Sequence, residues 1–200
     1  MKLTTEDRNR IKASIRQKYA EVSISPEGFF RYPTGRVGLE ALGYASEIIR
    51  SLPEAAISSY CGVGNPFTLG KIDGGERVLD IGCGGGMDTL AAALMVGPSG
   101  NVVGIDMVSD MLIRARKNLQ ETSLPNVTFL EASAENLPFR DRSFDVVLSN
   151  GVFNLIVDKA RVLAEVFRVL KPNGRLMIAD QILTGDLPGD TKSRVESWFR

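Results

Sequence analysis

A glycine-rich turn between two carboxylates is the part of this chain whose residue types and spacing could do chemistry. An apolar run ends at Asp80, and glycines follow at positions 82, 84 and 86. Glycine permits a sharp turn and a close approach of the backbone to a ligand. A second apolar run ends at Asp106, where a carboxylate can accept hydrogen bonds from both hydroxyls of a ribose. The pattern predicts a site for a ligand that contains a nucleoside.

The spacing of the glycines distinguishes two classes of cofactor. A dinucleotide site has the pattern G-x-G-x-x-G, which would require a glycine where this chain has Met87. Asp80 would repel a pyrophosphate, but it would attract an ammonium group. S-adenosylmethionine carries an ammonium and no phosphate, so the turn favours this cofactor. Two alternatives remain. One is a nicotinamide-dependent oxidoreductase, which the turn disfavours, and the other is a β–α turn that binds no ligand and needs glycine only for tight packing.

The composition excludes several kinds of chemistry. The chain has no histidine, which excludes histidine-based acid–base catalysis and Ser-His-Asp triads. Its two cysteines, Cys61 and Cys83, indicate neither a disulfide framework nor a metal cluster, so we expect no metal. The 24 basic residues equal the 24 acidic ones, and no basic stripe is interleaved with aromatics, so nucleic acid is not the expected partner. Without a long apolar run or a signal peptide, we expect no membrane partner and a cytoplasmic location.

Alternating strand and helix patterns predict the elements that position these residues. The predicted strands are 77–81, 101–106, 127–131, 143–149 and 174–180. The predicted helices are 6–20, 36–50, a short one from Pro53 towards Tyr60, 87–96, 109–121, a short one near 134–137, and 158–170. Such alternation favours an α/β fold, a Rossmann-like, doubly wound parallel sheet. We expect residues 1–70 to form an N-terminal helical cap and residues 71–200 to form the core.

Ligands of such sheets bind beyond the carboxyl ends of the strands, where the strand order reverses. Four predicted strands deliver polar or small groups to that edge. These groups are Asp80, Asp106, Ala132–Glu135 and Asn150–Val152. Ser109 or Asp110 could cap the helix after Asp106, which would leave the Asp106 carboxylate free for a ligand.

Five stretches of the core resemble class I S-adenosylmethionine-dependent methyltransferases. They are Val78–Gly86, Val103–Met107, Ala134–Phe139, Ser143–Asn150 and Glu165–Leu176. The resemblance implies S-adenosylmethionine as cofactor, S-adenosylhomocysteine as product and a small-molecule acceptor. A non-catalytic or truncated module that binds S-adenosylmethionine is the alternative function.

The same resemblance implies roles for individual residues. Asp80 would lie near the methionyl ammonium, Gly82 and Gly84 along the methionyl and ribose portion, and Asp106 on the ribose hydroxyls. The remaining predicted cofactor contacts are Cys83 inside the turn, Met107 beside the adenine, Ala134 and Glu135 at the adenine edge, and Asn150 near the sulfonium. The side chain of Cys83 is expected to be small filler in the turn.

The chain is more closely similar to the arsenite methyltransferase and UbiE-like branch of that family. This similarity rests on Gly62–Pro66, Ser149–Leu155 and Ala179–Leu183. Arsenite methylation in that branch relies on cysteine thiolates, but this chain has Val63 and Gly151 at two of their positions. The resemblance thus indicates the fold and cofactor, and it argues against arsenic as the acceptor unless Cys61 substitutes for a missing thiol.

The catalytic residue is left open by the sequence. Asn150, Tyr60 and Cys61 are the candidates, and Glu135 or Asp180 could serve as a base if one is needed. The family sheet has seven strands, so two C-terminal strands are expected to be missing here, and 195–200 resembles an interrupted helix. An exposed fifth strand predicts a homo-oligomer.

Overall fold

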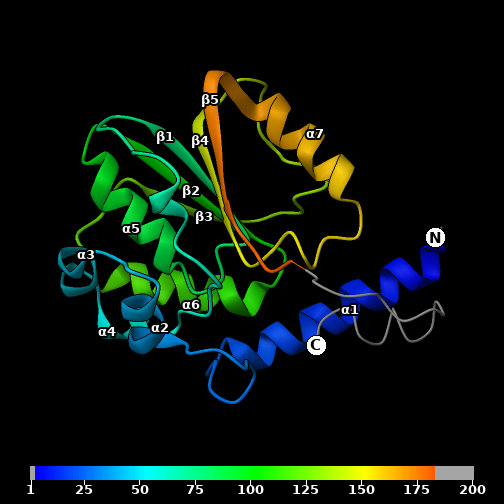
Figure 1. Cartoon of the computed structure of the whole chain (residues 1–200). Coiled ribbons are helices and arrows are strands. Elements are labelled where there is room, and N and C mark those ends of the chain that lie inside the picture. The colour runs from blue at the N-terminus through cyan, green and yellow to red at the C-terminus, as the bar shows by residue number, and fades with distance from the viewer. Residues whose placement is uncertain (1–2, 183–200) are drawn as a thin grey trace.

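A five-stranded parallel sheet forms the centre of the computed structural model, which describes residues 3–182 (Figure 1). The strands are β1 (Arg77–Ile81), β2 (Asn101–Asp106), β3 (Val127–Glu131), β4 (Phe144–Asn150) and β5 (Leu170–Ala179). Their order is β3-β2-β1-β4-β5, and every neighbouring pair is parallel. The predicted doubly wound sheet is confirmed, and its order reverses between β1 and β4.

Helices cover both faces of the sheet. They are α1 (Thr5–Val22), α2 (Gly35–Ala41), α3 (Ser46–Ser51), α4 (Glu54–Ser58), the 3-10 turn η1 (Pro66–Thr68), α5 (Met87–Val96), α6 (Ser109–Gln120) and α7 (Lys159–Val169). Successive side chains of a strand point to opposite faces. Val78 therefore packs towards α5, whereas Leu79 packs towards α7. This two-sided burial explains why the strands are continuous apolar runs.

The register of the sheet brings the predicted site residues to one edge. Ile81, the last residue of β1, pairs with Ile105 of β2 and with Ser149 of β4. The next residues along these strands are Gly82, Asp106 and Asn150. These three positions, far apart in the sequence, consequently lie side by side where the strand order reverses.

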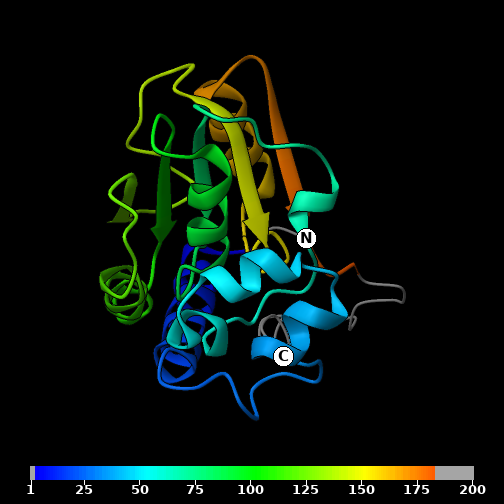
Figure 2. The same cartoon turned by 90° about the vertical axis from the view of Figure 1, so that its left-hand side faces the viewer.

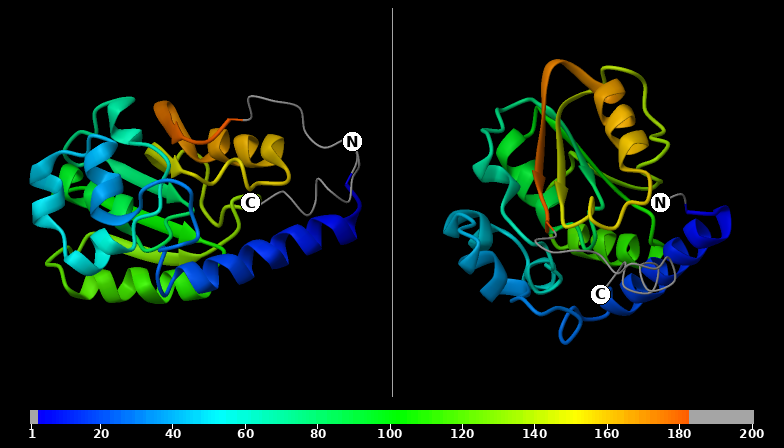
Figure 3. Two further views of the ribbon diagram at one scale, coloured as in Figure 1. Left: turned by 60° about the horizontal axis from the view of Figure 1, so that its bottom comes forward. Right: turned by 45° about the vertical axis from the view of Figure 1, so that its right-hand side comes forward.

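The N-terminal helices lie across this edge of the sheet. Strand β4 points towards them in Figure 2, and α1 runs beside α6 in Figure 3. Thr4 begins α1 with a reciprocal capping box, in which it exchanges hydrogen bonds with Asp7. The buried side chains of Ile11 and Ile15 fix α1 against the loop that follows β4. Helix α1 thus lies over the carboxyl ends of the strands, whereas α2, α3 and α4 share an apolar core with α5.

Two predicted helices were wrong. The single helix expected over 36–50 is divided into α2 and α3, because Gly43 adopts a left-handed conformation (φ 71°) that ends α2. The short helix expected near 134–137 is a turn. The fifth strand begins four residues earlier than predicted, at Leu170, directly after α7. The interrupted helix expected at 195–200 lies outside the described residues.

Candidate functional site

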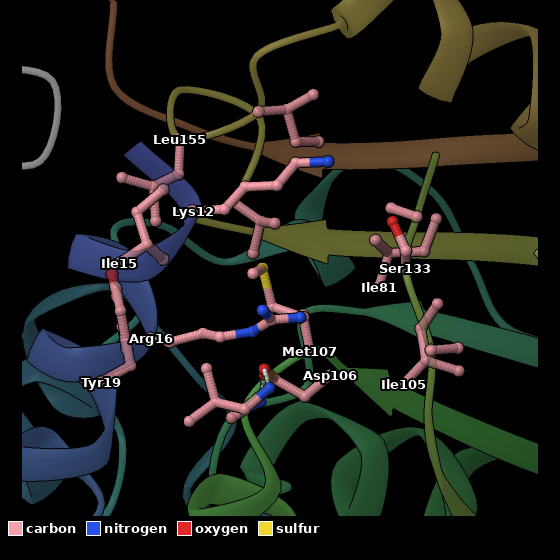
Figure 4. A pocket seen from close by; sticks show the side chains of 18 of the residues that line it. Lys12, Ile15, Arg16, Tyr19, Ile81, Ile105, Asp106, Met107, Ser133 and Leu155 are labelled. Atoms are coloured by element: carbon pink, nitrogen blue, oxygen red, sulfur yellow. Dashed lines mark hydrogen bonds between the residues drawn. The ribbon is translucent and has the colours of Figure 1, made fainter. Parts of the chain in front are cut away.

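A cavity of about 230 Å³ lies at the carboxyl ends of β1, β2 and β4, below helix α1. Figure 4 shows Lys12, Ile15, Arg16 and Tyr19 of α1 on one side of it, with Ile81, Ile105 and Ser133 of the core opposite. The lining also includes Asp106, Met107, Ala134, Glu135 and the loop Asn150–Val152. Three of the four groups that the sequence placed together, those at 106, 132–135 and 150–152, therefore surround one space.

Asp106 lies at the floor of this cavity with its carboxylate oriented by the backbone. Its two oxygens accept hydrogen bonds from the N–H groups of Gly84 and Val108, each over 2.9 Å. Burial raises the pKa of Asp106, and these backbone hydrogen bonds act in the opposite direction. A carboxylate has about four acceptor positions, so Asp106 retains acceptor capacity for a ligand hydroxyl.

The expected capping of α6 is wrong. The helix begins after Val108 without a side-chain cap from Ser109 or Asp110. Asp106 instead binds the Val108 N–H just ahead of the helix. The carboxylate consequently serves both the local turn and the cavity.

Asp80 lies in a second, smaller cavity of about 40 Å³ on the other side of the glycine turn. Its side chain is buried and accepts a hydrogen bond from Thr89 Oγ1 over 2.6 Å. Burial, reinforced by the neighbouring Asp88 carboxyl, raises the pKa of Asp80 to about 8. A cationic group in this cavity would favour the ionised carboxylate and would be held by it.

The glycine turn joins the two cavities. Gly82 and Gly84 line both cavities and have positive φ values of 73° and 51°. A Cβ atom at Gly82 would lie 2.3 Å from Val152, so only glycine fits there. Nothing lies within 4 Å of a Cβ atom built on Gly84, which leaves that backbone open to a ligand. Cys83 packs its side chain against Leu112 and Phe129, as expected for filler, although it also borders the smaller cavity.

Asn150 borders both cavities, but its amide is engaged by the protein. Its Oδ1 accepts hydrogen bonds from the N–H groups of Val63 (2.9 Å) and Gly64 (3.2 Å). Its Nδ2 donates to Asp88 Oδ2 (2.9 Å) and to the Gly64 carbonyl (2.8 Å). The arrangement suits a residue that positions the loop before the core more than one that reacts.

Tyr60 and Cys61 also lie at the smaller cavity. Tyr60 is buried and donates its hydroxyl proton to the Gly64 carbonyl over 2.8 Å, and burial raises its pKa. Cys61 borders both cavities, and burial raises the pKa of its thiol to about 12. Both groups remain protonated near neutral pH, so neither provides a ready base or thiolate.

The other two proposed bases, Glu135 and Asp180, already interact with other parts of the protein. Glu135 Oε2 lies 2.5 Å from Lys12 Nζ, so the loop after β3 is tied to α1. Asp180 accepts a hydrogen bond from the Asn154 N–H over 3.1 Å, and it does not belong to the lining described for either cavity. Neither carboxylate is poised to accept a proton from a ligand.

The sequence interpretation missed several residues that build the site. Asp88 and Tyr44 form a buried hydrogen bond of 2.6 Å beside the smaller cavity. Lys12 and Arg16 of α1 face the larger cavity. Only Asp88 had a signal in the sequence, since it is an acid in the first turn of the helix that follows the glycines.

The two cavities offer hydrogen-bond acceptors suited to a ribose in one and a carboxyl suited to an ammonium in the other. Asp106 offers acceptors in the larger cavity, and Asp80 offers a carboxyl in the smaller one. The open backbone of Gly84 lies between them. Within residues 3–182, no group of three or more His, Cys, Asp or Glu side chains could hold a metal ion. The helices in the same range include none that is long and apolar enough to cross a membrane.

Fold and site together define an α/β domain that binds a nucleoside-containing cofactor where its strand order reverses. A family model described as "Methyltransferase domain" matches residues 72–200. The chain belongs to this family, the S-adenosylmethionine-dependent methyltransferases of the Rossmann-like fold.

Two kinds of methyltransferase are among the relatives with assigned activities. An arsenite methyltransferase from Halobacterium salinarum is 34% identical over 205 residues, which cover 96% of this chain and 52% of that protein. A demethylmenaquinone methyltransferase from Lactobacillus johnsonii is 39% identical over 111 residues, covering 55% of this chain and 46% of that protein. The chain thus spans about half the length of the curated relatives that it matches.

Solved structures agree with the fold. An arsenic(III) S-adenosylmethionine methyltransferase from Chlamydomonas reinhardtii is 34% identical with a TM-score of 0.56, covering 74% of this chain and 50% of that one. A SAM-dependent methyltransferase from Aquifex aeolicus is 27% identical with a TM-score of 0.55, covering 62% of this chain and 69% of that one.

Proposed function

We propose that this protein transfers a methyl group from S-adenosylmethionine to a small-molecule acceptor. The observation that carries the proposal is the pair of joined cavities. One contains an oriented carboxylate at Asp106, and the other contains a buried carboxyl at Asp80. An acceptor for ribose hydroxyls and a carboxyl for an ammonium, joined by the glycine turn, suit this cofactor, whereas Asp80 would repel the pyrophosphate of a dinucleotide.

The cofactor supplies an electrophilic methyl group when it is bound, and the protein supplies its position. Asp106 would accept hydrogen bonds from the ribose hydroxyls, and Asp80 would bind the ammonium. Met107 and Ala134 would contact the adenine, because they line the larger cavity next to Asp106. The segment 1–70 would act as a cap whose helix α1 excludes water from the cavity. Alignment of donor and acceptor is then the main contribution to the rate.

The acceptor is proposed to be a soft or already anionic nucleophile, such as a thiol or a quinone-like ring. Neither carboxylate that lines the larger cavity is assigned to the acceptor, since Glu135 pairs with Lys12 and Asp106 binds backbone N–H groups and would hold the ribose. Arsenite is the less favoured acceptor. A Cβ atom at Gly151 would lie 3.4 Å from Val63 Cγ1, so the two positions aligned with the branch's thiols are neighbours and neither is a cysteine.

The second candidate function is a module that binds S-adenosylmethionine without catalysis. The missing thiols and the protonated state of Cys61 favour it over an arsenite enzyme. Transfer of radiolabel from the cofactor to a panel of thiols, quinone-like phenols and arsenite distinguishes the two. Labelled product from any member supports the enzyme. Binding of S-adenosylhomocysteine with no product from the panel supports the module.

Replacement of Asp106 tests the cofactor assignment directly. Asp106→Ala should weaken binding of S-adenosylhomocysteine by about 1.5–3 kcal/mol, the range for hydrogen bonds to a charged group. Calorimetric titration measures the change, and Asp110→Ala on the exposed first turn of α6 is the matched control. Equal affinity in Asp106→Ala and wild type would rule out the ribose assignment. Titration with NAD, which should not bind, tests the oxidoreductase alternative.

A further inference from the structure

A buried carboxyl that the proposed reaction does not use lies beside the smaller cavity. Asp88 is 7% exposed, and it accepts hydrogen bonds from the Tyr44 hydroxyl (2.6 Å) and from Asn150 Nδ2 (2.9 Å). Tyr44 belongs to the turn between α2 and α3, whereas Asn150 ends β4. Asp88 on α5 therefore joins the cap to the strand end that carries the site.

Both of its partners hold the segment that precedes the core. Asn150 accepts hydrogen bonds from the N–H groups of Val63 and Gly64 and donates to the Gly64 carbonyl. The Tyr44 hydroxyl lies 3.2 Å from the same carbonyl and 3.2 Å from the Tyr60 hydroxyl. The loop 60–64 is consequently fixed by two side chains whose own orientation is set by Asp88.

This loop forms one wall of the smaller cavity. Tyr60, Cys61 and Gly62 line it opposite Asp80. The loop is docked so closely that a Cβ atom at Gly62 would lie 2.4 Å from Asn150 Nδ2 and 2.6 Å from the Tyr60 hydroxyl. A small rotation of the Asn150 amide would therefore displace the wall.

We propose that Asp88 is a positioning residue that closes the methionyl end of the cofactor cavity by fixing Asn150 and Tyr44 against the loop 60–64. The inference rests on the proposed function, because it assigns the smaller cavity to the methionyl group. Asp88 acts through its partners, and the reaction itself requires no proton transfer to it.

A carboxylate suits this task because both of its oxygens are acceptors that face donors. An asparagine at position 88 would present its NH2 group either to the Tyr44 hydroxyl or to the Asn150 amide. One of these two groups could then no longer donate its hydrogen bond to residue 88, which loosens the docked loop. Tyr44→Phe removes a single donor and retains the ring, so it is the milder variant of the same network.

The test compares two ligands on Asp88→Asn, Tyr44→Phe and the double variant. S-adenosylhomocysteine has an amino-acid end, whereas 5′-methylthioadenosine has the same nucleoside without that end. Asp88→Asn should weaken S-adenosylhomocysteine about tenfold or more, since one buried hydrogen bond is lost. Binding of 5′-methylthioadenosine should change by less than about twofold, because its contacts lie at Asp106. Asp73→Asn on the exposed loop before β1 is the control.

Two further readouts separate positioning from general destabilisation. The effects of Asp88→Asn and Tyr44→Phe on S-adenosylhomocysteine should be less than additive in the double variant, because both act on one network. In the ligand-free protein, alkylation of Cys61, located by peptide mass spectrometry, should be faster in Asp88→Asn than in wild type. This second readout does not depend on any cofactor.

Several outcomes would overturn the inference. Equal losses for the two ligands would make Asp88 a residue that merely stabilises the domain, and no loss for either would remove its role. Unchanged Cys61 alkylation would show that the loop does not depend on Asp88. Failure of wild type to bind S-adenosylhomocysteine contradicts the proposed function, and Cys61 alkylation then still decides whether Asp88 holds the loop. If Asp88→Asn does not fold, binding of the two ligands and alkylation of Cys61 are compared between Tyr44→Phe and wild type.

Discussion

Asp80 should make cofactor binding depend on pH. Its pKa is raised to about 8 by burial and by Asp88, with Thr89 acting in the opposite direction. The carboxyl is therefore mostly protonated at pH 6, and binding of an ammonium requires loss of that proton. Affinity for S-adenosylhomocysteine should rise with pH by up to about tenfold per unit below pH 8.

Calorimetric titration between pH 6 and 8 checks this dependence on Asp80. Asp80→Asn should bind more weakly at pH 8 and lose most of the slope, because the titrating carboxyl is gone. The nucleoside 5′-methylthioadenosine, which has no ammonium, should show little slope in wild type. A slope that persists unchanged in Asp80→Asn would assign the dependence to Asp88 or Asp106 instead.

The carboxylates of Asp80 and Asp106 that line the two cavities could be predicted from the sequence, but the side chains that hold the cavity walls in place could not. Asp80 and Asp106 end apolar runs, so their place at the sheet edge follows from the strand pattern. The role of Asn150 depends on Gly64 and Asp88, which are distant in sequence and meet only in the folded chain. Nothing in the local pattern indicates that its amide would be occupied by the loop before the core.

Among the helices and strands, too, those set by the local sequence pattern could be predicted, and those set by distant contacts could not. Strands β1, β2 and β3 have the predicted bounds, because each is an apolar run between turn residues. The helix expected over 36–50 failed at Gly43, where the apolar pattern continues although the backbone turns. Residues 134–137 are held instead by tertiary contacts, since the Leu137 N–H donates to Glu165 Oε2 over 2.7 Å. Periodicity alone carries no information about such contacts.

The attachment of the cap to α6 should depend on Arg114. Its guanidinium donates to the carbonyls of Ser23 (2.7 Å) and Ile24 (2.6 Å), which follow the end of α1. A cation also suits the carbonyl end of a helix. Arg114→Ala should lower the free energy of unfolding by about 1–3 kcal/mol through these unpaired carbonyls.

Limited proteolysis at residues 23–32 should be faster in Arg114→Ala, and denaturant unfolding gives the loss of stability. Arg116→Ala is the matched control, because Arg116 lies on the same helix and donates to the Phe129 carbonyl of the sheet. Equal protease sensitivity in the two variants would show that the cap is held mainly by its apolar side chains.

The outer side of the sheet is where we expect self-association. β5 is an outer strand of the five that the structure describes. On the adjacent helix α7, Phe167 is 83% exposed and Leu163 is 46% exposed. Exposed strand edges and apolar side chains promote pairing between chains. We therefore expect a dimer at micromolar concentration and a monomer for Phe167→Asp, measured by light scattering. A wild-type mass of one chain would contradict this expectation.

The buried carboxyls at the site should also set how the stability of the whole molecule depends on pH. Burial raises the pKa of Asp80 to about 8, that of Asp88 to about 6, and that of Asp106. A group whose pKa is higher in the folded state binds its proton more tightly there. Its contribution to stability is complete below the unfolded pKa near 4 and is lost as the pH rises through the folded pKa. The pKa of Glu165 is lowered to about 2, so its contribution to stability is lost only as the pH falls below about 4.

The ligand-free protein should thus be most stable near pH 5 and less stable at pH 8. The melting temperature should therefore fall from pH 5 to pH 8, by roughly 2–4 °C for each kcal/mol lost in a chain of this size. Saturating S-adenosylhomocysteine should raise the melting temperature more at pH 8 than at pH 5, because its ammonium compensates the ionised Asp80. Thermal unfolding of wild type and Asp80→Asn, with and without ligand, measures both effects, and the variant should show the flatter profile. A melting temperature that rises from pH 5 to pH 8 without ligand would mean that these carboxyls are already ionised in the folded protein.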